Sequence, residues 1–333
     1  MAAGTHQKLK MLYLADILNK FTDEDNPLNA EEICGKLAQY GISAERKAIY
    51  NDIEMLILYG YDIVKTRTPR FGYFMASREL ELPEIYMLGD AVRSADFITS
   101  KKTRELLQKL DGMLSISQAK KRDKGIYIDS SRKSKNEEIY YNIDTVNKAI
   151  DSGKKVSLKY CNRVLNDGKN IGIREKQLTI SPYAMMWQND HYYLVGNNEK
   201  YDNLIHLRLD RIKKAEVTAQ DARPFSEVCE YTDTFDIADY AKKVFNMYGG
   251  TLQHIEFKCS KGIMEQILDR FTDNIMIHHV TETTFNFSTD ALVSDGLVGF
   301  LLQFGNNIEV IKPDNLRDKI KQKIADLYEV YGK

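Results

Sequence analysis

The residues with the clearest chemistry lie close together near the N-terminus of this 333-residue chain. Arg46, Lys47, Tyr50 and Asn51 fall within the first two turns of one predicted helix, on its polar side. Arginine and lysine pair well with the acceptor atoms of guanine, and asparagine pairs well with adenine. The same residues also fit an ordinary solvated helix face, so this pattern alone leaves base recognition and simple exposure open.

A short hairpin is predicted directly after this helix. Two strand-like segments, Tyr61–Lys65 and Phe71–Met75, are separated by a turn that contains Pro69. Basic side chains at the tip of such a hairpin would meet backbone phosphates, which favours contact with duplex DNA. The basic residues at the tip are Lys65, Arg67 and Arg70. The predicted DNA-binding residues are therefore Ser43, Arg46, Lys47, Tyr50, Asn51, Lys65, Arg67 and Arg70.

Two further helices would position the basic one. Apolar residues at helical spacing between Leu9 and Ile17, including Leu12, predict the first helix. Asn29 stands three residues before Glu32, a capping-box pattern that predicts the start of the second helix.

The connection between the second and third helices is predicted to be short. Gly41 suits the end of the second helix, and Ser43 follows as the expected N-cap of the third, which stops before Gly60. Two helices joined by a turn of three to four residues form a helix-turn-helix. With the hairpin, residues 1–78 are predicted to be a winged helix-turn-helix domain.

Residues 79–138 are predicted to form a helical connector and a basic linker. Pro83 opens one helix, and a second runs from about Ser100 to Leu114, after which apolar residues become scarce. A solvated linker is the favoured interpretation of the last part, and a second contact with the DNA backbone is the alternative. Its basic residues are Lys120, Lys121, Arg122, Lys124, Arg132, Lys133 and Lys135.

A third region, residues 139–225, begins with a helix and continues as short strands. Strand-like alternation recurs from Val156 to Thr218, with turn signals at Asn166-Asp167-Gly168 and Asn189-Asp190. Five or more short strands in about 65 residues indicate a small, strongly bent sheet or barrel.

Three runs in this region resemble the core of the WYL-domain transcriptional regulators. They are Ser181-Pro182-Tyr183, His191-Tyr192-Tyr193-Leu194-Val195 and His206-Leu207-Arg208-Leu209-Asp210-Arg211-Ile212. The triplet that names the family is Tyr192-Tyr193-Leu194 here, so tyrosine replaces its tryptophan, and Trp187 does not fill that position.

The resemblance extends to both ends of the chain. Residues 43–53 resemble the family's recognition helix, with Ala48 in place of the usual threonine and Asn51 where arginine or lysine is frequent. Residues 300–305 and 309–313 resemble its C-terminal extension, in which Phe300 replaces tryptophan.

The resemblance implies an Sm-like β-barrel that senses a ligand, frequently a nucleic-acid fragment or a nucleotide. Arginine can hold phosphate with two hydrogen bonds, and tyrosine or histidine can stack on bases. His206, Arg208 and Asp210 are expected on one strand face, with Arg208 as a ligand residue. An ion pair between Asp210 and Arg211 is an equally good structural interpretation of those two residues. The candidate ligand-binding residues are Tyr160, Tyr183, His191, Tyr193, His206, Arg208 and Arg211.

Residues 250–333 are predicted to form a small α+β domain, because strand and helix patterns alternate along them. The family resemblance gives this domain a role in dimer contacts or in completing a partner's pocket. The predicted fold class of the whole chain is multidomain α+β.

Several function classes are disfavoured. The sequence has no phosphate-binding glycine-rich loop, metal-ligand helix motif or nucleophile elbow, and its four cysteines stand singly. We therefore expect no enzyme, no cofactor and no metal site. No apolar run approaches the roughly 20 residues of a membrane span, and the N-terminus lacks a secretory apolar region, so a cytoplasmic location is expected.

The formal net charge of −1 provides no overall attraction to nucleic acid, so the prediction depends on where the charges lie. The predicted function is a homodimeric, DNA-binding transcriptional regulator whose middle domain senses an anionic ligand and changes operator binding. The alternative is a nucleic-acid-binding or protein-interaction module without ligand-gated regulation.

Overall fold

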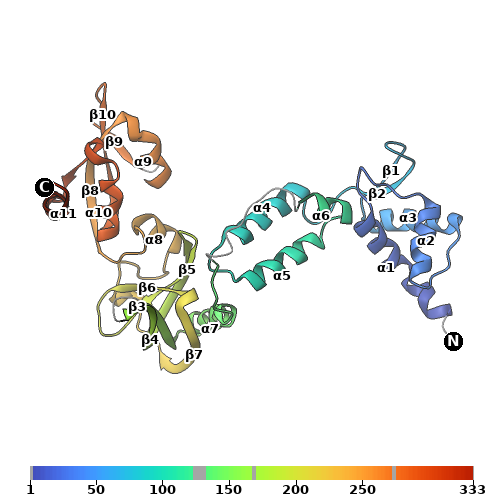
Figure 1. The fold of residues 1–333 in the computed structure, drawn as a ribbon, viewed down its shortest axis with the longest axis horizontal. Coiled ribbons are helices and arrows are strands. Elements are labelled where there is room, and N and C mark those ends of the chain that lie inside the picture. Colours follow the sequence, from blue (N-terminus) through green and yellow to red (C-terminus); the bar gives the residue numbers. More distant parts are fainter. Residues whose placement is uncertain (1–2, 123–132, 167–169, 272–274, 333) are drawn as a thin grey trace. The chain divides into compact units, whose positions relative to one another are not determined.

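The computed structural model describes residues 3–122, 133–166, 170–271 and 275–332 (Figure 1). Two compact units divide the chain, Met1–Lys135 and Asn136–Lys333, and each is described by itself. Helices and strands are mixed in both, which agrees with the predicted α+β class. Within the described ranges, no helix combines the length and apolar character that a membrane span requires.

The first unit begins with three helices and a hairpin. These elements are α1 (Ala3–Phe21), α2 (Ala30–Gln39), α3 (Arg46–Tyr59), β1 (Ile63–Thr66) and β2 (Gly72–Met75). The inward face of α1 consists of Leu14, Ile17 and Leu18, all fully buried. The first helix is present as predicted, but Leu9 and Leu12, whose spacing helped to predict it, are exposed, because the buried stripe starts at Leu14.

The start of α2 has the predicted capping box. The Asn29 side chain accepts hydrogen bonds from the backbone N–H groups of Glu31 and Glu32, each at 3.0 Å. The Glu32 carboxylate accepts one in return from the Asn29 backbone N–H at 2.8 Å. The N-terminus of α2 is thereby fixed by its own side chains.

The predicted start of α3 at Ser43 was wrong. The residue before the helix is Glu45, which makes no side-chain cap, so residues 40–45 form a longer connection than three to four residues. The reason is Ile42, which is 1% exposed and donates its backbone N–H to the Leu37 carbonyl at 3.1 Å. Burying Ile42 in the core keeps this segment out of the helix.

The hairpin is attached to the helical core through its second strand. Strands β1 and β2 are antiparallel and pair Lys65 with Tyr73. Tyr73 also exchanges two backbone hydrogen bonds with Leu28, at 2.8 and 3.0 Å. A Cβ at the neighbouring Gly72 would lie within 2.8 to 2.9 Å of the Leu28 backbone, so this close approach requires glycine.

Three further helices complete the first unit: α4 (Leu82–Ser94), α5 (Ser100–Asp111) and α6 (Ile116–Arg122). Helices α4 and α5 lie side by side (Figure 1). The prediction of a solvated linker from Ser115 onward was wrong for residues 115–122, because α6 begins at Ile116. Ser115 is buried, and its hydroxyl donates to the Asp23 carboxylate and accepts from the Gln118 backbone N–H at 3.0 Å.

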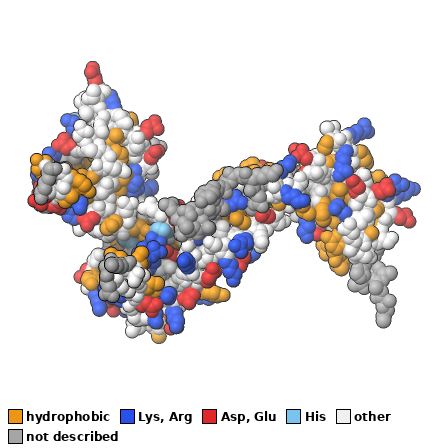
Figure 2. Space-filling view, in the orientation of Figure 1, with side chains coloured by type: hydrophobic (Ala, Val, Ile, Leu, Met, Phe, Trp, Pro, Cys, Tyr) orange, Lys and Arg blue, Asp and Glu red, His pale blue; other side chains and the backbone are white. Residues whose placement is uncertain are grey.

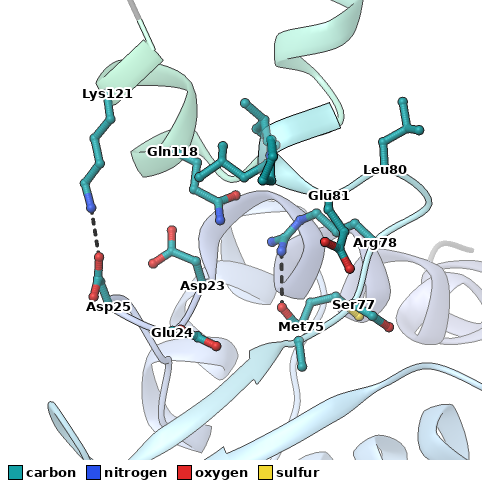
Figure 3. A pocket seen from close by; sticks show the side chains of 14 residues that line it. Asp23, Glu24, Asp25, Met75, Ser77, Arg78, Leu80, Glu81, Gln118 and Lys121 are labelled. Carbon is teal, nitrogen blue, oxygen red and sulfur yellow. Dashed lines mark hydrogen bonds and ion pairs between the residues drawn. The ribbon is translucent and has the colours of Figure 1, made fainter. Parts of the chain in front are cut away.

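Two lysines of the predicted linker have specific partners. Lys121 pairs with Asp25 at 2.8 Å beside a cavity whose other side is formed by Arg78 and its neighbours (Figure 3). Lys133 is buried, and its ammonium donates to the carbonyls of Val92 (3.1 Å) and Ala95 (2.7 Å) at the end of α4. The predicted contacts of Lys124 and Arg132 lie outside the described residues.

The second unit opens with α7 (Ile139–Asp151) and a five-stranded antiparallel sheet of order β6-β5-β4-β3-β7. The buried side chain of Asn142 joins α7 to this sheet, donating to the Ile212 carbonyl at 2.7 Å. Strands β6 and β7 form the two edges of this sheet and are not paired with each other in its strand order. Closure of the sheet into a barrel therefore stays a prediction. The strands are β3 (Lys154–Asn166), β4 (Asn170–Gln188), β5 (His191–Asn197), β6 (Leu204–Arg208) and β7 (Ile212–Asp221).

Two turns were predicted in this sheet, and the structure describes one of them. Asn189 and Asp190 both have positive φ, 50° and 57°, and join the paired residues Gln188 and His191 as predicted. The other turn, at Asp167 and Gly168, lies outside the described residues. Asp210 was expected on a strand with Arg208, but it lies in the 3-10 turn η2 (Leu209–Arg211) after β6 ends.

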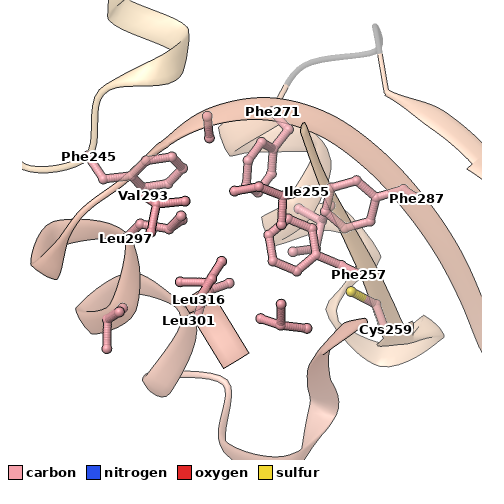
Figure 4. Packing of buried hydrophobic residues seen from close by; sticks show 14 of the residues in the cluster. Phe245, Ile255, Phe257, Cys259, Phe271, Phe287, Val293, Leu297, Leu301 and Leu316 are labelled. Carbon is pink, nitrogen blue, oxygen red and sulfur yellow. The ribbon is translucent and has the colours of Figure 1, made fainter. Parts of the chain in front are cut away.

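The C-terminal part contains the predicted alternation of strands and helices. It has a four-stranded antiparallel sheet of order β11-β8-β10-β9. Phenylalanines 257, 271 and 287 lie at its centre, with ring centroids 5.0 to 6.1 Å apart (Figure 4). The elements are α8 (Ile237–Lys243), β8 (Thr251–Ser260), α9 (Met264–Phe271), β9 (Met276–His278), β10 (Thr284–Val293), α10 (Asp295–Leu302), β11 (Ile308–Lys312) and α11 (Asp314–Tyr331).

Candidate nucleic-acid interface and ligand surface

The predicted DNA-binding side chains are all accessible in the first unit. Four of them follow one another along the first two turns of α3, and three surround the β1–β2 turn, where basic side chains are visible in Figure 2. The exposed residues are Ser43, Arg46, Lys47, Tyr50, Asn51, Lys65, Arg67 and Arg70. Their contact with DNA remains a prediction.

Aromatic rings join the helix to the hairpin. The Tyr50 ring of α3 lies 6.2 Å from the Tyr73 ring of β2. The Lys65 ammonium lies 5.9 Å from the centroid of the Tyr73 ring and 5.5 Å from that of Phe71. Tyr73 is buried, and this burial raises the pKa of its phenol, which stays neutral. Tyr73 therefore holds Tyr50 and Lys65, which belong to different elements, on one surface.

Two acidic residues at the start of α2 lie beside this surface. Arg70 pairs with Glu32 at 2.7 Å, and Arg46 lies 3.8 Å from Glu31, with both side chains of the latter pair largely exposed. Sequence reasoning missed these pairs, because it considered the two glutamates only as part of a helix start. The pairs reduce the net positive charge of the surface, and solvent screens both of them.

Arg208 is the central cation of the candidate ligand surface in the second unit. Its guanidinium donates to both carboxylate oxygens of Asp210, from Nε at 3.0 Å and from Nη2 at 2.7 Å. Asp210 therefore pairs with Arg208 and not with Arg211. Burial opposes the charge of Arg208, but the hydrogen bond and charge of Asp210 outweigh it and raise its pKa, so the guanidinium stays charged.

Two tyrosines lie beside this ion pair, and a histidine packs against one of them. Tyr193 on β5 is paired with Arg208 on β6, and the Tyr160 hydroxyl accepts the Arg208 backbone N–H at 3.4 Å. The His191 ring packs edge-on against Tyr193, with centroids 6.2 Å apart. Burial raises the pKa of Tyr193, and the charge of Arg208 partly offsets this. A neutral, half-buried phenol beside a guanidinium can both stack on a base and donate a hydrogen bond.

Tyr183 and His206 belong to a different environment. The Tyr183 hydroxyl donates to the Arg223 carbonyl at 2.8 Å, and its ring packs against Phe225 and Phe235. His206 Nε2 is 2.8 Å from the Tyr240 hydroxyl, and burial lowers the pKa of His206 to about 4. Tyr183 packs against an apolar cluster that contains Tyr240, the partner of His206, so a ligand role for both residues stays a prediction that this packing does not favour.

Two family models match the second unit. The WYL domain model matches residues 141–217, and the WCX domain model matches residues 251–328. The chain therefore contains a WYL domain and a WCX domain. The WYL domain includes α7 and most of the five-stranded sheet, so the Arg208 cluster lies within it. The WCX domain contains the four-stranded sheet and the packed phenylalanines.

One curated relative extends the similarity to nearly the whole chain. The uncharacterized HTH-type transcriptional regulator YobV of Bacillus subtilis (strain 168) is 23% identical over 298 residues, which cover 86% of this WYL-domain protein and 89% of YobV.

A solved structure with similarity is the proteasome accessory factor B/C (PafBC) of Arthrobacter aurescens, at 13% identity and a TM-score of 0.27. The match covers 97% of this chain but only 49% of that one, so the chain spans about half its length. At this score the match establishes no common arrangement of the two full chains.

Proposed function

We propose that this WYL-domain protein is a DNA-binding transcriptional regulator with a winged helix-turn-helix in its first unit. The domain matches and the distant HTH-type relative support a DNA-binding regulator. The observation that carries the proposal is the common surface of α3 and the β1–β2 hairpin, on which Tyr73 holds Tyr50 and Lys65 together.

In the proposed complex, the first two turns of α3 enter the major groove. Arg46, Lys47 and Asn51 would contact base edges there, since their donors and acceptors match guanine and adenine. The hairpin residues Arg67 and Arg70 would contact phosphates, which fix the register of the protein on DNA without reading its sequence. The regulator would bind a palindromic operator as a homodimer.

We further propose that the WYL domain binds an anionic ligand at Arg208, either a nucleotide or a short single-stranded nucleic acid. Among the described residues, Nη1 of Arg208 makes no hydrogen bond, so it can donate to a phosphate while Asp210 holds the other edge. His191 and Tyr193 offer rings on which a base can stack. For the ligand to change DNA binding, it must bind the two DNA-binding states with different affinities.

The alternative function is a nucleic-acid-binding or protein-interaction module without ligand gating. The carboxylate of Asp210 favours this alternative, because an incoming anion must compete with this carboxylate for the same guanidinium. Asp210→Asn tests whether Arg208 is the anion site. It should tighten binding of a short single-stranded DNA severalfold if Arg208 is the anion site, whereas Arg208→Ala should abolish that binding.

The test of DNA binding starts by selecting duplexes from a random-sequence pool with the purified full chain. The selected duplex is then titrated over a salt series with the wild type, Arg46→Ala/Lys47→Ala and the matched control Lys101→Ala, an exposed lysine of α5. We expect the double variant to lose at least about tenfold in affinity and to show a shallower salt dependence. Equal binding by all three proteins would reject the winged helix-turn-helix as the DNA-binding element.

A further inference from the structure

An apolar groove lies on the first unit, between α1 and the C-terminal part of α3. It has a volume of about 550 Å³, and its lining contains no charged residue. Hydrophobic side chains gather at the lower edge of this unit in Figure 2. The residues that line the groove are Met11, Leu12, Ala15, Met55, Leu56, Leu58, Tyr59 and Tyr61.

The exposure of these side chains is unusually high for apolar residues. Leu12 is 68% exposed, Met55 56%, Leu58 79% and Tyr59 83%. With Tyr61, they present an apolar area on the order of 600 Å², at the upper end of the largest patches on ordinary monomers. A stable protein interface buries about 800 Å² per partner. The groove and its rim are therefore large enough to form the core of such an interface.

The charges around the groove indicate what covers it. Lys10 on α1 and Asp52 on α3 pair with each other at 2.7 Å, and Lys20 pairs with Asp16 at 2.9 Å. These pairs neutralise four of the neighbouring charges within the chain, so the lining of the groove itself offers little to attract an acidic or basic partner. An uncharged apolar surface can, however, face a copy of itself, as a twofold-symmetric interface requires.

The position of the groove leaves the candidate DNA surface free. Leu58 follows Arg46 by twelve positions on α3, which corresponds to about 18 Å along the helix. A partner seated at Leu58 and Tyr59 would therefore lie at the opposite end of the helix from the residues proposed to read bases.

We infer that two copies of the chain associate through this α1–α3 groove, face to face about a twofold axis. The inference deepens the proposed function, on whose homodimeric regulator it rests, by naming the surface that joins the two DNA-binding units. Each copy inserts Leu58 and Tyr59 against Leu12 and Met55 of the other.

Sedimentation velocity of the full chain without DNA, over a concentration series, tests this inference. Leu58→Glu places a charge in the groove at a position already in solvent, so the fold should persist. We expect it to weaken self-association at least about tenfold. Met87→Glu on α4 is the matched control, because Met87 is 72% exposed but lies outside the groove, and it should leave self-association unchanged.

Cross-linking provides a second readout that does not depend on other dimer contacts. Leu58→Cys treated with a short bis-maleimide should yield covalent dimers well above the background of the wild type and of Met87→Cys. A monomeric wild type, or a Leu58→Glu chain that associates as tightly as the wild type, overturns the inference, as does Leu58→Cys at background yield. The two Leu58 results would leave the proposed homodimer and its Arg46-dependent DNA binding intact, whereas a monomeric wild type would also reject the homodimer of the proposed function.

Discussion

At the residue scale, Glu31 and Glu32 connect the start of α2 with the candidate DNA surface. Each pairs with an arginine that we propose to meet DNA, Arg46 or Arg70, and Glu32 also completes the capping box. Both pairs would have to open before the arginines could contact DNA. In the proposed complex, the two glutamates would therefore reduce the affinity for any duplex and make binding depend more on base contacts.

Glu31→Gln/Glu32→Gln is expected to tighten binding to a random duplex by about fivefold, since two exposed ion pairs contribute up to roughly 1 kcal/mol. Glutamine at position 32 still accepts the capping hydrogen bond, so α2 should be preserved. Fluorescence anisotropy at two salt concentrations measures the change. Glu265→Gln on α9, which removes one equivalent exposed charge, serves as control. Unchanged binding by the double variant would show that these pairs are irrelevant to DNA contact.

His206 gives the second unit a defined pH dependence. Its pKa is lowered to about 4 in the folded chain, whereas an unfolded histidine titrates near 6.5. Between these values the unfolded chain binds the extra proton, so the contribution of His206 to stability is present above about pH 6.5 and is lost as the pH falls toward 4.

The thermal midpoint of the second unit should therefore fall from pH 7 to pH 5, and less steeply in His206→Gln. Glutamine can keep the hydrogen bond to Tyr240 without taking up a proton. Calorimetry at both pH values measures the difference, with His254→Gln at an exposed position as control. The same fall in wild type and His206→Gln would exclude His206 as its cause.

At the scale of elements, the sequence predicted what local chemistry determines. The capping box at Asn29, the end of α3 at Gly60 and the tight turn at Asn189-Asp190 each depend on residues that are adjacent in the chain. The prediction failed where a contact between residues far apart in the chain determines the structure. Ile42 moves the start of α3 because the core buries it, and the stripe of α1 is rotated toward Leu14 for the same reason.

Helix α6 is a local feature that the sequence contained and the prediction missed. Ser115 followed three residues later by Gln118 is a capping box, in which the Ser115 backbone N–H donates to the Gln118 side chain at 3.1 Å. The many basic residues of this segment favoured the interpretation as a linker, and the capping box was overlooked. The contact of Ser115 with Asp23 joins two segments far apart in sequence, and no local pattern indicates it.

Ser115→Ala should destabilise α6 by about 1 to 2 kcal/mol, because the helix loses its cap and the buried Asp23 carboxylate loses a donor. Hydrogen exchange of the α6 amides should become faster, while exchange in the WCX domain should not change. Ser117→Ala, on the first turn of the same helix, controls for the loss of a hydroxyl. Equal protection of α6 in wild type and Ser115→Ala would contradict this account.

At the scale of the whole molecule, the two candidate sites belong to different units. The candidate DNA surface lies in the first unit, and the Arg208 cluster lies in the second. Within the ligand set, Tyr160, His191, Tyr193 and Arg208 come together, whereas Tyr183 packs elsewhere and His206, two positions from Arg208 on β6, contacts Tyr240. Strand alternation predicts faces, but it does not predict that a 3-10 turn brings Asp210 back onto Arg208.

If a ligand at Arg208 changes DNA binding, the coupling must be reciprocal. The selected duplex should change the Kd of a short single-stranded DNA for the WYL domain by the same factor as that ligand changes the Kd of the duplex. Isothermal titration with each partner in turn measures both factors. Arg208→Ala should retain ligand-free duplex binding and lose the response. Mutually exclusive binding would mean that the two molecules compete for one surface, and no change in either Kd would contradict the coupling.

The two backbone hydrogen bonds between Leu28 and Tyr73 have a consequence for the thermodynamics of the proposed DNA complex. They fix the base of the hairpin to the helical core before any DNA arrives, and Gly72 permits the close approach they require. An element that is ordered in the free protein gives up little conformational entropy on association. The hairpin would thus meet phosphates as a preorganised element. The favourable free energy of its charged contacts would not be offset by the entropic cost of ordering it.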